Sequence, residues 1–252
     1  GVYGKSYRRR SPQNVVNEIK IIQQQYNPDN IWFVDDVFTV SHKWLEEFTV
    51  LLEEQQVKVN FECITRADRL NEEAIQLLKR AGCFRVWIGA ESGSQKIIDL
   101  MDRRVDVKVV QQMINAAQKA GIQAGTFIML GYPTETEEDI KQTLQHLKNS
   151  NPEWFTITIT YPIRGTELFE EVEAVSNANQ INWAENTDRD IDFKRTYNKQ
   201  YYHHAVQWII NEMAFYQRKN KQLSVVASVK TKIKSVRARI GMMVEKRKTS
   251  MA

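Results

Sequence analysis

Polar residues and glycines directly follow five runs of residues that are typical of β-strands. In chain order they are Asp35 with Asp36, Thr65 with Arg66, Glu91 with Ser92, Gly131, and Arg164 with Thr166. Carboxylates accept hydrogen bonds from an ammonium group or from ribose hydroxyls, and an arginine such as Arg66 or Arg103 forms a bidentate pair with a ligand carboxylate. Glycines such as Gly125 and Gly131 let a flat ring lie against the main chain. Together these groups suit an amino acid joined to a nucleoside. The strand starts carry no comparable set, although scattered loop polarity explains any single strand end.

Runs rich in branched and aromatic residues predict the strands that position these groups. The predicted strands cover 31–34, 57–63, 84–90, 121–130 and 154–161. Between and after them, apolar residues that recur at helical spacing predict helices over 42–55, 72–81, 106–120 and 136–149. A further helix over 12–26 precedes the first strand, with Ser11 and Pro12 at its start as helix beginnings favour.

The alternation of strands and helices predicts an α/β fold with a parallel sheet. Strands that are separated by helices pair in parallel through right-handed crossovers, and such folds bind ligands at the carboxyl ends of the strands. An open doubly wound sheet and a (β/α) barrel both fit, and the short repeated units favour the barrel. Because the helix over 12–26 has no strand before it, we predict a partial (β/α)6 barrel that lacks its first strand. The chain begins with Gly1, and we expect a fragment whose upstream part carries that strand.

Composition excludes several classes of protein. The chain has 252 residues, of which 42% are apolar, but it has no run of about 18 apolar residues that could span a bilayer. Two cysteines, Cys63 and Cys83, are too few for a disulfide scaffold, so we expect a reduced, cytoplasmic setting. We interpret both cysteines as small core residues, and the four histidines show no metal-binding spacing.

Charge divides the chain into an acidic body and a basic tail. Residues 217–252 hold eleven lysines and arginines and one acid, Glu245, while the remainder has 24 basic and 30 acidic residues. The acidic body argues against nucleic acid as a partner. Within 220–252, apolar residues at a spacing of three and four predict a basic amphipathic helix. Such a helix packs back on its own barrel, docks on a partner protein, or lies on an anionic membrane surface.

Five segments of the chain together resemble the radical S-adenosylmethionine (SAM) superfamily, in particular the branch that carries an upstream cobalamin-binding domain. The resemblance covers about residues 1–172. It rests on YRRRSPQNVVNEI, FVDDVFT, the stretch from CITRADRL to ESGSQKIIDLMDR, GIQAGTFIMLGYPTETEEDI and TITYPIRGTELFEEV. It implies a radical SAM core over 1–175, followed by a helical extension over 176–252.

The resemblance implies SAM contacts at or just after the strand ends. The positions are Asp35, Asp36, Thr65, Arg66, Glu91, Ser92, Arg103, Phe127, Ile128 and Gly131. The pair Asp35–Asp36 matches the family's contact to the SAM amino group, and Arg103 matches a basic residue that reaches the SAM carboxylate. The backbone of 127–131 matches the segment that meets the adenine.

The resemblance also implies cofactors and a mechanism. The family holds a [4Fe–4S] cluster on a CxxxCxxC loop, and we expect those cysteines upstream of Gly1, so that this chain alone is inactive. The reduced cluster cleaves SAM to methionine and a 5′-deoxyadenosyl radical, which acts on a substrate. Relatives handle small-molecule or lipid-like substrates by methyl transfer or oxidative cyclisation, some with cobalamin. An electron donor such as flavodoxin or ferredoxin is implied.

Two other interpretations stay open at this point. The chain also fits a (β/α) barrel enzyme that never held a cluster, or a SAM-binding or scaffolding remnant without catalysis. For the basic tail, the membrane hypothesis predicts a cytoplasmic protein that associates peripherally with a membrane through residues 220–252.

Overall fold

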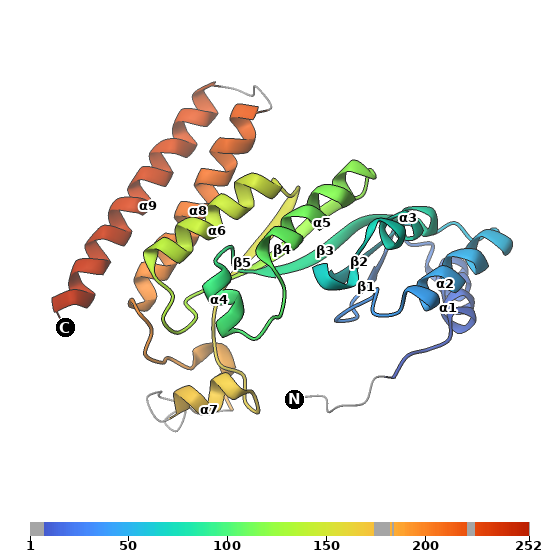
Figure 1. The fold of residues 1–252 in the computed structure, drawn as a ribbon, viewed down its shortest axis with the longest axis horizontal. Coiled ribbons are helices and arrows are strands. Elements are labelled where there is room, and N and C mark those ends of the chain that lie inside the picture. Colours follow the sequence, from blue (N-terminus) through green and yellow to red (C-terminus); the bar gives the residue numbers. More distant parts are fainter. Residues whose placement is uncertain (1–7, 174–181, 183, 221–224, 252) are drawn as a thin grey trace. The chain divides into compact units, whose positions relative to one another are not determined.

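The computed structural model describes residues 8–173, 182, 184–220 and 225–251 (Figure 1). The chain forms two compact units, which are described separately. The first comprises residues 9–128 and 145–156, and the second comprises residues 1–8, 129–144 and 157–252. The predicted boundary between a core over 1–175 and an extension over 176–252 falls among residues 174–181. These lie outside the described residues, so the boundary stays a prediction.

The helices of the first unit begin and end close to the predicted residues. They are α1 (Pro12–Tyr26), α2 (His42–Glu54), α3 (Glu72–Ala81) and α5 (Val107–Lys119). The Ser11 side chain accepts a hydrogen bond from the Asn14 N–H at 3.3 Å and so caps α1. Helix α3 ends at Gly82, where φ is 96° and a Cβ atom would lie 2.0 Å from the carbonyl oxygen of Val59. Only glycine fits at this turn.

Five strands form one sheet in which spatial order follows chain order. They are β1 (Ile31–Phe33), β2 (Phe61–Arg66), β3 (Cys83–Glu91), β4 (Gln123–Leu130) and β5 (Trp154–Ile159). The pairs β1–β2, β2–β3 and β3–β4 are parallel. A doubly wound sheet would reverse its strand order at one point. The sequential order is that of a (β/α) barrel, and the predicted α/β class is confirmed.

The second strand lies later in the chain than predicted. It covers Phe61–Arg66 rather than 57–63, because the chain first completes the turn after α2. Gln56 has a φ of 52°, and the Val57 N–H donates to the carbonyl oxygen of Leu52 at 2.9 Å. Thr65 and Arg66 therefore belong to the strand itself and do not follow it. Four short elements of the described chain were also not predicted, namely α4 (Gln95–Leu100), α7 (Glu167–Glu173) and the 3₁₀ turns Ala67–Arg69 and Asp188–Asp190.

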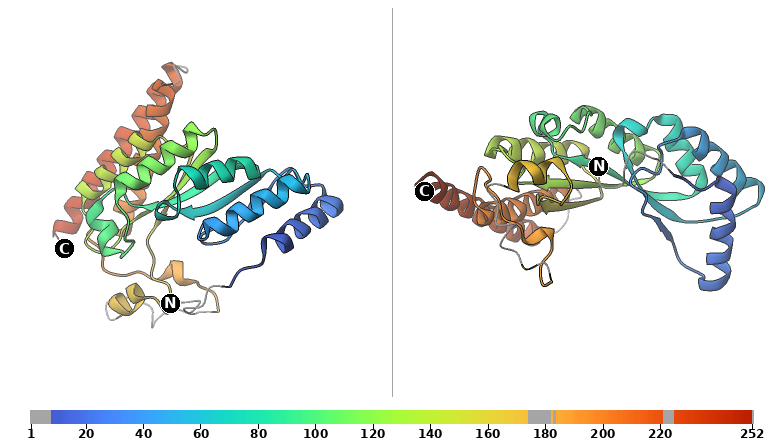
Figure 2. Two further views of the ribbon diagram at one scale, coloured as in Figure 1. Left: turned by 45° about the vertical axis from the view of Figure 1, so that its right-hand side comes forward. Right: turned by 90° about the horizontal axis from the view of Figure 1, so that it is seen from below.

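The two faces of the first unit's sheet differ in burial. In β2, Phe61, Cys63 and Thr65 are buried, whereas the alternate residues Glu62 and Ile64 are half-buried. The buried face packs against α2 and its neighbouring helices, which lie along one side of β1–β3 (Figure 2). The opposite, open face carries side chains that are free to meet ligands or one another.

The second unit contains the two longest helices, α8 (Lys199–Asn220) and α9 (Val225–Met251). Helix α9 packs against α8 through a buried face that includes Ser235, Ala238 and Met242. The remaining helix, α6 (Glu137–Ser150), contributes its first turns to this unit. The Glu137 carboxylate accepts hydrogen bonds from Arg239 and Lys246 of α9. In the described residues, no helix is long and apolar enough to cross a bilayer.

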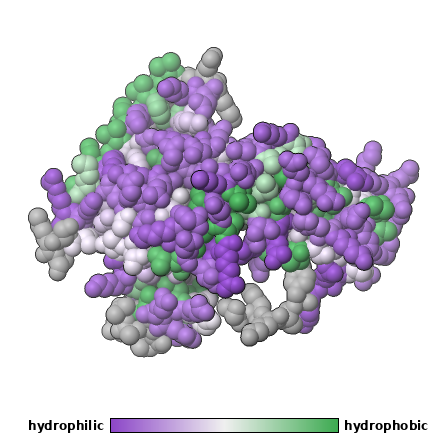
Figure 3. All heavy atoms as spheres, viewed as in Figure 1, coloured by the Kyte–Doolittle hydropathy of each residue, from purple (hydrophilic) through white to green (hydrophobic). Residues whose placement is uncertain are grey.

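The apolar residues predicted for the tail helix lie mainly on the outside of α9. Val226, Val229, Ile233, Val236 and Ile240 are all exposed. Figure 3 shows hydrophobic (green) surface over α9, along the upper left edge of the view. The predicted helix is therefore confirmed, but its apolar stripe faces away from α8.

Candidate SAM site

An ion pair at the end of β3 forms the centre of the candidate site. Arg103 Nη2 lies 2.5 Å from Glu91 Oε1, and the side chains are 37% and 15% exposed, respectively. A Cβ atom on Gly89 would lie 3.1 Å from Glu91 Oε1 and 3.8 Å from Arg103 Nη2. The missing side chain of Gly89 therefore leaves the space in which the two charged groups meet.

Local backbone geometry directs the side chains of Glu91 and Arg103 towards each other. The register between β3 and β4 shifts between Gly89 and Glu91, which marks a bulge, and Glu91 has a φ of 59°. Such a conformation is uncommon for a residue other than glycine and turns the side chain out of the regular alternation. After α4, the Arg103 N–H donates to the carbonyl oxygen of Ile98 at 3.1 Å. This hydrogen bond closes the turn that returns Arg103 towards the strand end.

Arg66 holds this turn against the neighbouring strand. Its Nη2 donates to the carbonyl oxygen of Arg103 at 2.9 Å, and its Nε donates to Asp68 at 2.8 Å. Burial raises the pKa of Glu91, while the charges of Arg103 and Arg66 act in the opposite direction. A buried carboxylate beside two guanidinium groups is an environment suited to a charged, zwitterionic ligand.

Strand register places part of β4 beside this pair. Arg66 pairs with Gly89 across β2 and β3, and Gly89 pairs with Phe127 across β3 and β4. Glu91 pairs with Ile128, which is buried. The Phe127 ring stacks on Trp87 with centroids 5.0 Å apart and an interplanar angle of 16°. The structure thus brings Arg66, Glu91, Arg103 and the Phe127–Ile128 segment together.

The other predicted positions are arranged differently. Asp35 and Asp36 are exposed directly after β1, and Asp36 forms no hydrogen bond or ion pair within the described part of the chain. The Thr65 hydroxyl is buried and shares a hydrogen bond with Thr39, and the buried Ser92 hydroxyl accepts from the Ser94 N–H at 3.1 Å. These two hydroxyls have structural partners. For all four positions the SAM contacts stay predictions.

Gly131 belongs to the second compact unit. Its φ is 87°, and its N–H donates to Glu135 Oε2 at 2.6 Å. A Cβ atom at this position would lie 3.3 Å from Arg195 Cδ. This glycine therefore makes room for an arginine of its own unit, and its predicted contact to adenine stays a prediction.

Polar residues near the strand starts form a network that sequence reasoning missed. Glu62 Oε2 accepts from Arg85 Nη1 at 3.1 Å and from Trp87 Nε1 at 2.8 Å, and Arg85 also donates to Gln123 Oε1 at 2.8 Å. This network of mutual hydrogen bonds was not predicted from the sequence. The alternation of these residues with buried ones in the strands was the available signal. Because the groups satisfy one another, the network holds adjacent strands together.

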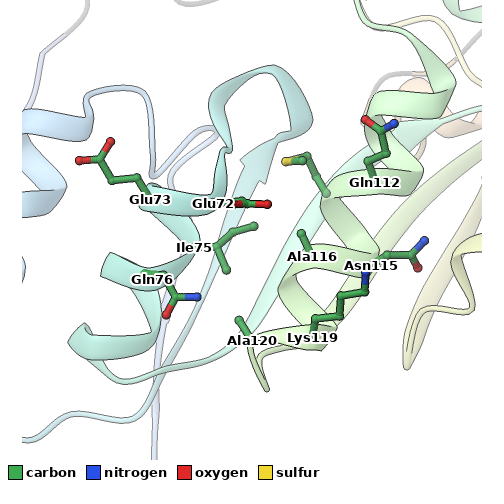
Figure 4. A pocket seen from close by; sticks show the side chains of 10 residues that line it. Glu72, Glu73, Ile75, Gln76, Gln112, Asn115, Ala116, Lys119 and Ala120 are labelled. Carbon is green, nitrogen blue, oxygen red and sulfur yellow. The ribbon is translucent and has the colours of Figure 1, made fainter.

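A separate hollow of about 650 Å³ lies between α3 and α5. Its lining includes Glu72 and Gln76 from α3, and Asn115 and Lys119 from α5 (Figure 4). None of the predicted site residues lines it, so it is distinct from the strand-end site.

The described residues do not fit the [4Fe–4S] cluster. They contain no group of three histidines, cysteines or acids that could hold a metal ion. Cys63 and Cys83 are buried, and burial raises the pKa of the Cys63 thiol well above its usual range. Both cysteines are thus inert core residues, as predicted, rather than thiolate ligands.

Comparison with known proteins identifies the family. A model described as Radical SAM superfamily matches residues 2–147. An uncharacterised methyltransferase of Pyrococcus horikoshii is 28% identical over 189 residues, which are 75% of this chain and 41% of that protein. The anaerobic magnesium-protoporphyrin IX monomethyl ester cyclase of Rubrivivax gelatinosus is 24% identical over 68% of this chain and 31% of its own length. The chain therefore spans less than half of these relatives.

Solved structures share the fold. The methyltransferase TsrM of Kitasatospora setae matches with a TM-score of 0.54 and 16% identity, over 60% of this chain and 30% of its own. The cobalamin-dependent enzyme OxsB matches with a TM-score of 0.59 and 14% identity, over 94% of this chain and 43% of its own. These likenesses agree with the partial (β/α) barrel followed by helices. With the family model covering more than half of its residues, the chain belongs to the radical SAM superfamily.

Proposed function

We propose that this chain is the SAM-binding part of a radical SAM enzyme that transfers a methyl group or closes a ring. The Glu91–Arg103 pair carries this proposal. Only Glu91 Oε1 and Arg103 Nη2 take part in the pair. Within the described chain, Glu91 Oε2 and Arg103 Nη1 form no hydrogen bond. Glu91 Oε2 therefore remains for the ammonium of an amino acid, and Arg103 Nη1 and Nε remain for its carboxylate.

The remaining site residues orient the ligand. Arg66 fixes the backbone of Arg103, so the guanidinium stays at the strand end. The Phe127–Ile128 segment of β4 lies beside Gly89, where the nucleoside end of SAM has a strand to lie against. Asp36 supplies an exposed carboxylate for a ribose or ammonium group. In this family the cluster supplies the electron that cleaves SAM. Its ligands are not among the described residues, and we assign this chain the roles of binding and orienting SAM.

The names of the relatives support the two reaction types. They include methyltransferases and a porphyrin ester cyclase, and OxsB carries cobalamin. We infer that the whole protein acts on a small-molecule or lipid-like substrate and takes electrons from a flavodoxin or ferredoxin. Cobalamin, bound by a domain upstream of Gly1, would supply the methyl group.

Binding of SAM by variants at two neighbouring arginines tests the site. Arg103→Gln removes the guanidinium, whereas Arg104→Gln alters an arginine that is 80% exposed and pairs with Asp102. Loss of a charged hydrogen-bond partner predicts that Arg103→Gln weakens SAM binding about ten- to hundredfold, as measured by calorimetry. Arg104→Gln should bind like the wild type. Equal affinities for all three proteins would overturn the assignment.

Turnover separates an enzyme from a remnant that only binds SAM. The full-length protein that contains this chain is reconstituted with iron and sulfide under anaerobic conditions and given SAM and a reductant. Formation of 5′-deoxyadenosine or S-adenosylhomocysteine supports the enzyme. SAM binding with an intact cluster and neither product would support the remnant.

A further inference from the structure

The second unit contains a basic hollow that shares no residue with the SAM site. It has a volume of about 330 Å³ and is lined by β5 residues and by the start of α8. Its lining includes Thr158, Thr160, Arg189, Arg195, Lys199 and His203. All of these residues belong to one compact unit. We call this site the β5–α8 hollow.

Two buried polar groups in the wall of the hollow have unused hydrogen-bonding atoms. The Arg195 side chain is only 4% exposed, and its Nη atoms donate to Asp192 at 2.7 Å and to the carbonyl oxygen of Thr160 at 3.0 Å. Its Nε atom and the Thr160 hydroxyl are buried without a partner in the described chain. Buried polar atoms normally find partners, so atoms left without one at a hollow indicate a ligand or ordered water.

Two further cations face the hollow without a matching acid. The Arg189 guanidinium lies over the Tyr161 ring at 5.5 Å. Within the described residues, neither Arg189 nor Lys199 forms an ion pair, although the Asp190 carboxylate is close enough to Lys199 to interact electrostatically. Lys199 is also the first residue of α8, where the helix dipole favours negative charge. The described lining of the hollow contains basic residues and no acid, and the carboxylates nearby in the chain are those of Asp188, Asp190 and Asp192.

We propose that the β5–α8 hollow binds the phosphate or carboxylate group of an anionic small molecule. Arg189 and Lys199 would supply the charge at the mouth of the hollow, and the buried Arg195 guanidinium would add to it from the wall. Planar guanidinium groups and hydroxyls suit both oxyanions. The site goes beyond the proposed function, because it uses none of the residues assigned to SAM.

Calorimetry with two simple probes tests this site. Inorganic pyrophosphate represents phosphate ligands, and citrate represents carboxylates. The double variant Arg189→Gln/Lys199→Gln should weaken binding of the preferred probe at least about tenfold, as expected for loss of charged partners. The variant Arg218→Gln/Lys219→Gln removes equal charge from the other end of α8 and should bind normally. SAM binding is measured in parallel and should not change in either variant.

The outcomes separate the possibilities. Stronger binding of pyrophosphate assigns the site to phosphate, and stronger binding of citrate assigns it to carboxylates. Failure of the wild type to bind either probe at millimolar concentration overturns the proposal. Equal weakening in both double variants also overturns it, since that result indicates only a general effect of net charge.

Helix α9 carries an independent feature, an unpartnered apolar face. The α9 stripe consists of Val226, Val229, Ile233, Val236, Ile240, Met243 and Val244, which are between 47% and 66% exposed. The opposite face is fixed against α8, since a Cβ atom on Gly241 would lie 2.7 Å from the His204 ring. The Glu137 carboxylate of α6 also forms hydrogen bonds with Arg239 and Lys246 of α9. The stripe therefore cannot turn inward without breaking these contacts.

Basic residues border the α9 stripe on both sides. Lys230, Lys234 and Arg237 are exposed on one flank, whereas on the other flank Lys232 pairs with Glu212 and Arg239 pairs with Glu137. Residues 225–251 contain eight lysines and arginines but a single acid, Glu245. Two copies of such a face would repel each other, so self-association is disfavoured. We infer that the α9 stripe lies on an anionic lipid surface, with apolar side chains in the interface and basic side chains at the headgroups.

Vesicle co-sedimentation tests this second inference. The wild type should bind vesicles that contain phosphatidylglycerol and should bind pure phosphatidylcholine vesicles at least about tenfold more weakly, with a loss in high salt. Ile233→Glu/Ile240→Glu should abolish binding. Gln207→Glu/Asn220→Glu adds the same charge at exposed positions of α8 and should retain it. The inference is overturned if the wild type does not bind the vesicles, if the stripe variant still binds them, or if the control loses binding equally. It is also overturned if the wild type binds an acidic protein but no vesicles.

Discussion

Glu91 Oε1 lies 2.5 Å from Arg103 Nη2, although the two residues are twelve positions apart in the chain. The two atoms meet beside Gly89. An alanine at residue 89 would bring a Cβ atom to 3.1 Å from the Glu91 oxygen. The carboxylate would then have to move by a few tenths of an ångström, and its partner would follow.

We therefore expect Gly89→Ala to weaken SAM binding several-fold while leaving the protein folded. Such a loss, measured by calorimetry, corresponds to about 1 kcal/mol. Gln24→Ala serves as the control, because Gln24 is exposed on α1 and takes no part in the site. If Gly89→Ala binds SAM as tightly as the wild type, the space above Gly89 is not part of the site.

The pH dependence of SAM binding should report on Glu91. Burial raises its pKa above the usual 4.5, despite Arg103 and Arg66. Only the ionised carboxylate attracts an ammonium group, so SAM affinity should fall as the pH is lowered through this raised pKa. In Glu91→Gln, binding should be weaker at neutral pH and should lack this acidic decline. A variant that keeps the wild-type pH profile would show that another group titrates.

The sequence predicts local features of the fold well. Helix α1 begins after Ser11 because the Ser11 side chain accepts a local hydrogen bond, and helix α3 ends at Gly82 because glycine adopts the positive φ needed there. The prediction of the second strand was less accurate, since residues 57–60 are as apolar and branched as many strands. The positive φ of Gln56 and the closing bond from Val57 to Leu52 delay that strand. Propensity alone does not encode this turn.

Long-range contacts of the site were harder to predict. The expectation that ligands bind at the carboxyl ends of the strands put Glu91 in the predicted site. The hydrogen bond from Arg66 to the Arg103 carbonyl, however, joins residues that are 37 positions apart in the chain. The Glu62–Arg85–Gln123 network depends on the register between β2, β3 and β4, whereas alternation within one strand shows only which of its side chains share a face. Register and turn geometry, rather than residue type, decide these contacts.

The stack of Trp87 on Phe127 depends on Gly125. An added Cβ there would lie 2.5 Å from the Trp87 ring, so the indole would have to leave its position. We expect Gly125→Ala to lower the free energy of unfolding by about 1–3 kcal/mol, as overpacking does, measured by urea titration. In a Trp87→Leu background the same substitution should cost less. Additive effects of the two substitutions would contradict the clash.

The Glu137 carboxylate should stabilise the second unit in a pH-dependent way. Burial would raise its pKa, but hydrogen bonds from Lys246 and Arg239 lower it from 4.5 to about 2. Its contribution to stability is therefore present above pH 4.5 and is lost as the pH falls towards 2. Glu137→Gln should lower the free energy of unfolding by about 1 kcal/mol at neutral pH and flatten this part of the acid profile. Glu138→Gln, on an exposed neighbour paired with Lys141, should do neither.

His146 in the first unit should respond to acid over a different range. Its ring is buried, Gln111 lies 3.2 Å from Nδ1, and burial lowers its pKa from 6.5 to about 4. As the pH falls between these values, the unfolded chain binds a proton that the folded chain excludes, so stability decreases. His146→Leu should remove on the order of 3 kcal/mol from this decrease, following the free energy per pKa unit.

The exposed His203 provides the matched control for this prediction. His203→Leu should keep the wild-type decline in the free energy of unfolding between pH 6.5 and 4, when urea titrations are repeated across that range. Subtracting the free energies of unfolding of two variants at each pH cancels the contribution of the acids that titrate near pH 4. A His146→Leu profile parallel to that of the wild type would mean that the ring is protonated in the folded protein, with Nε2 reaching solvent or an acceptor.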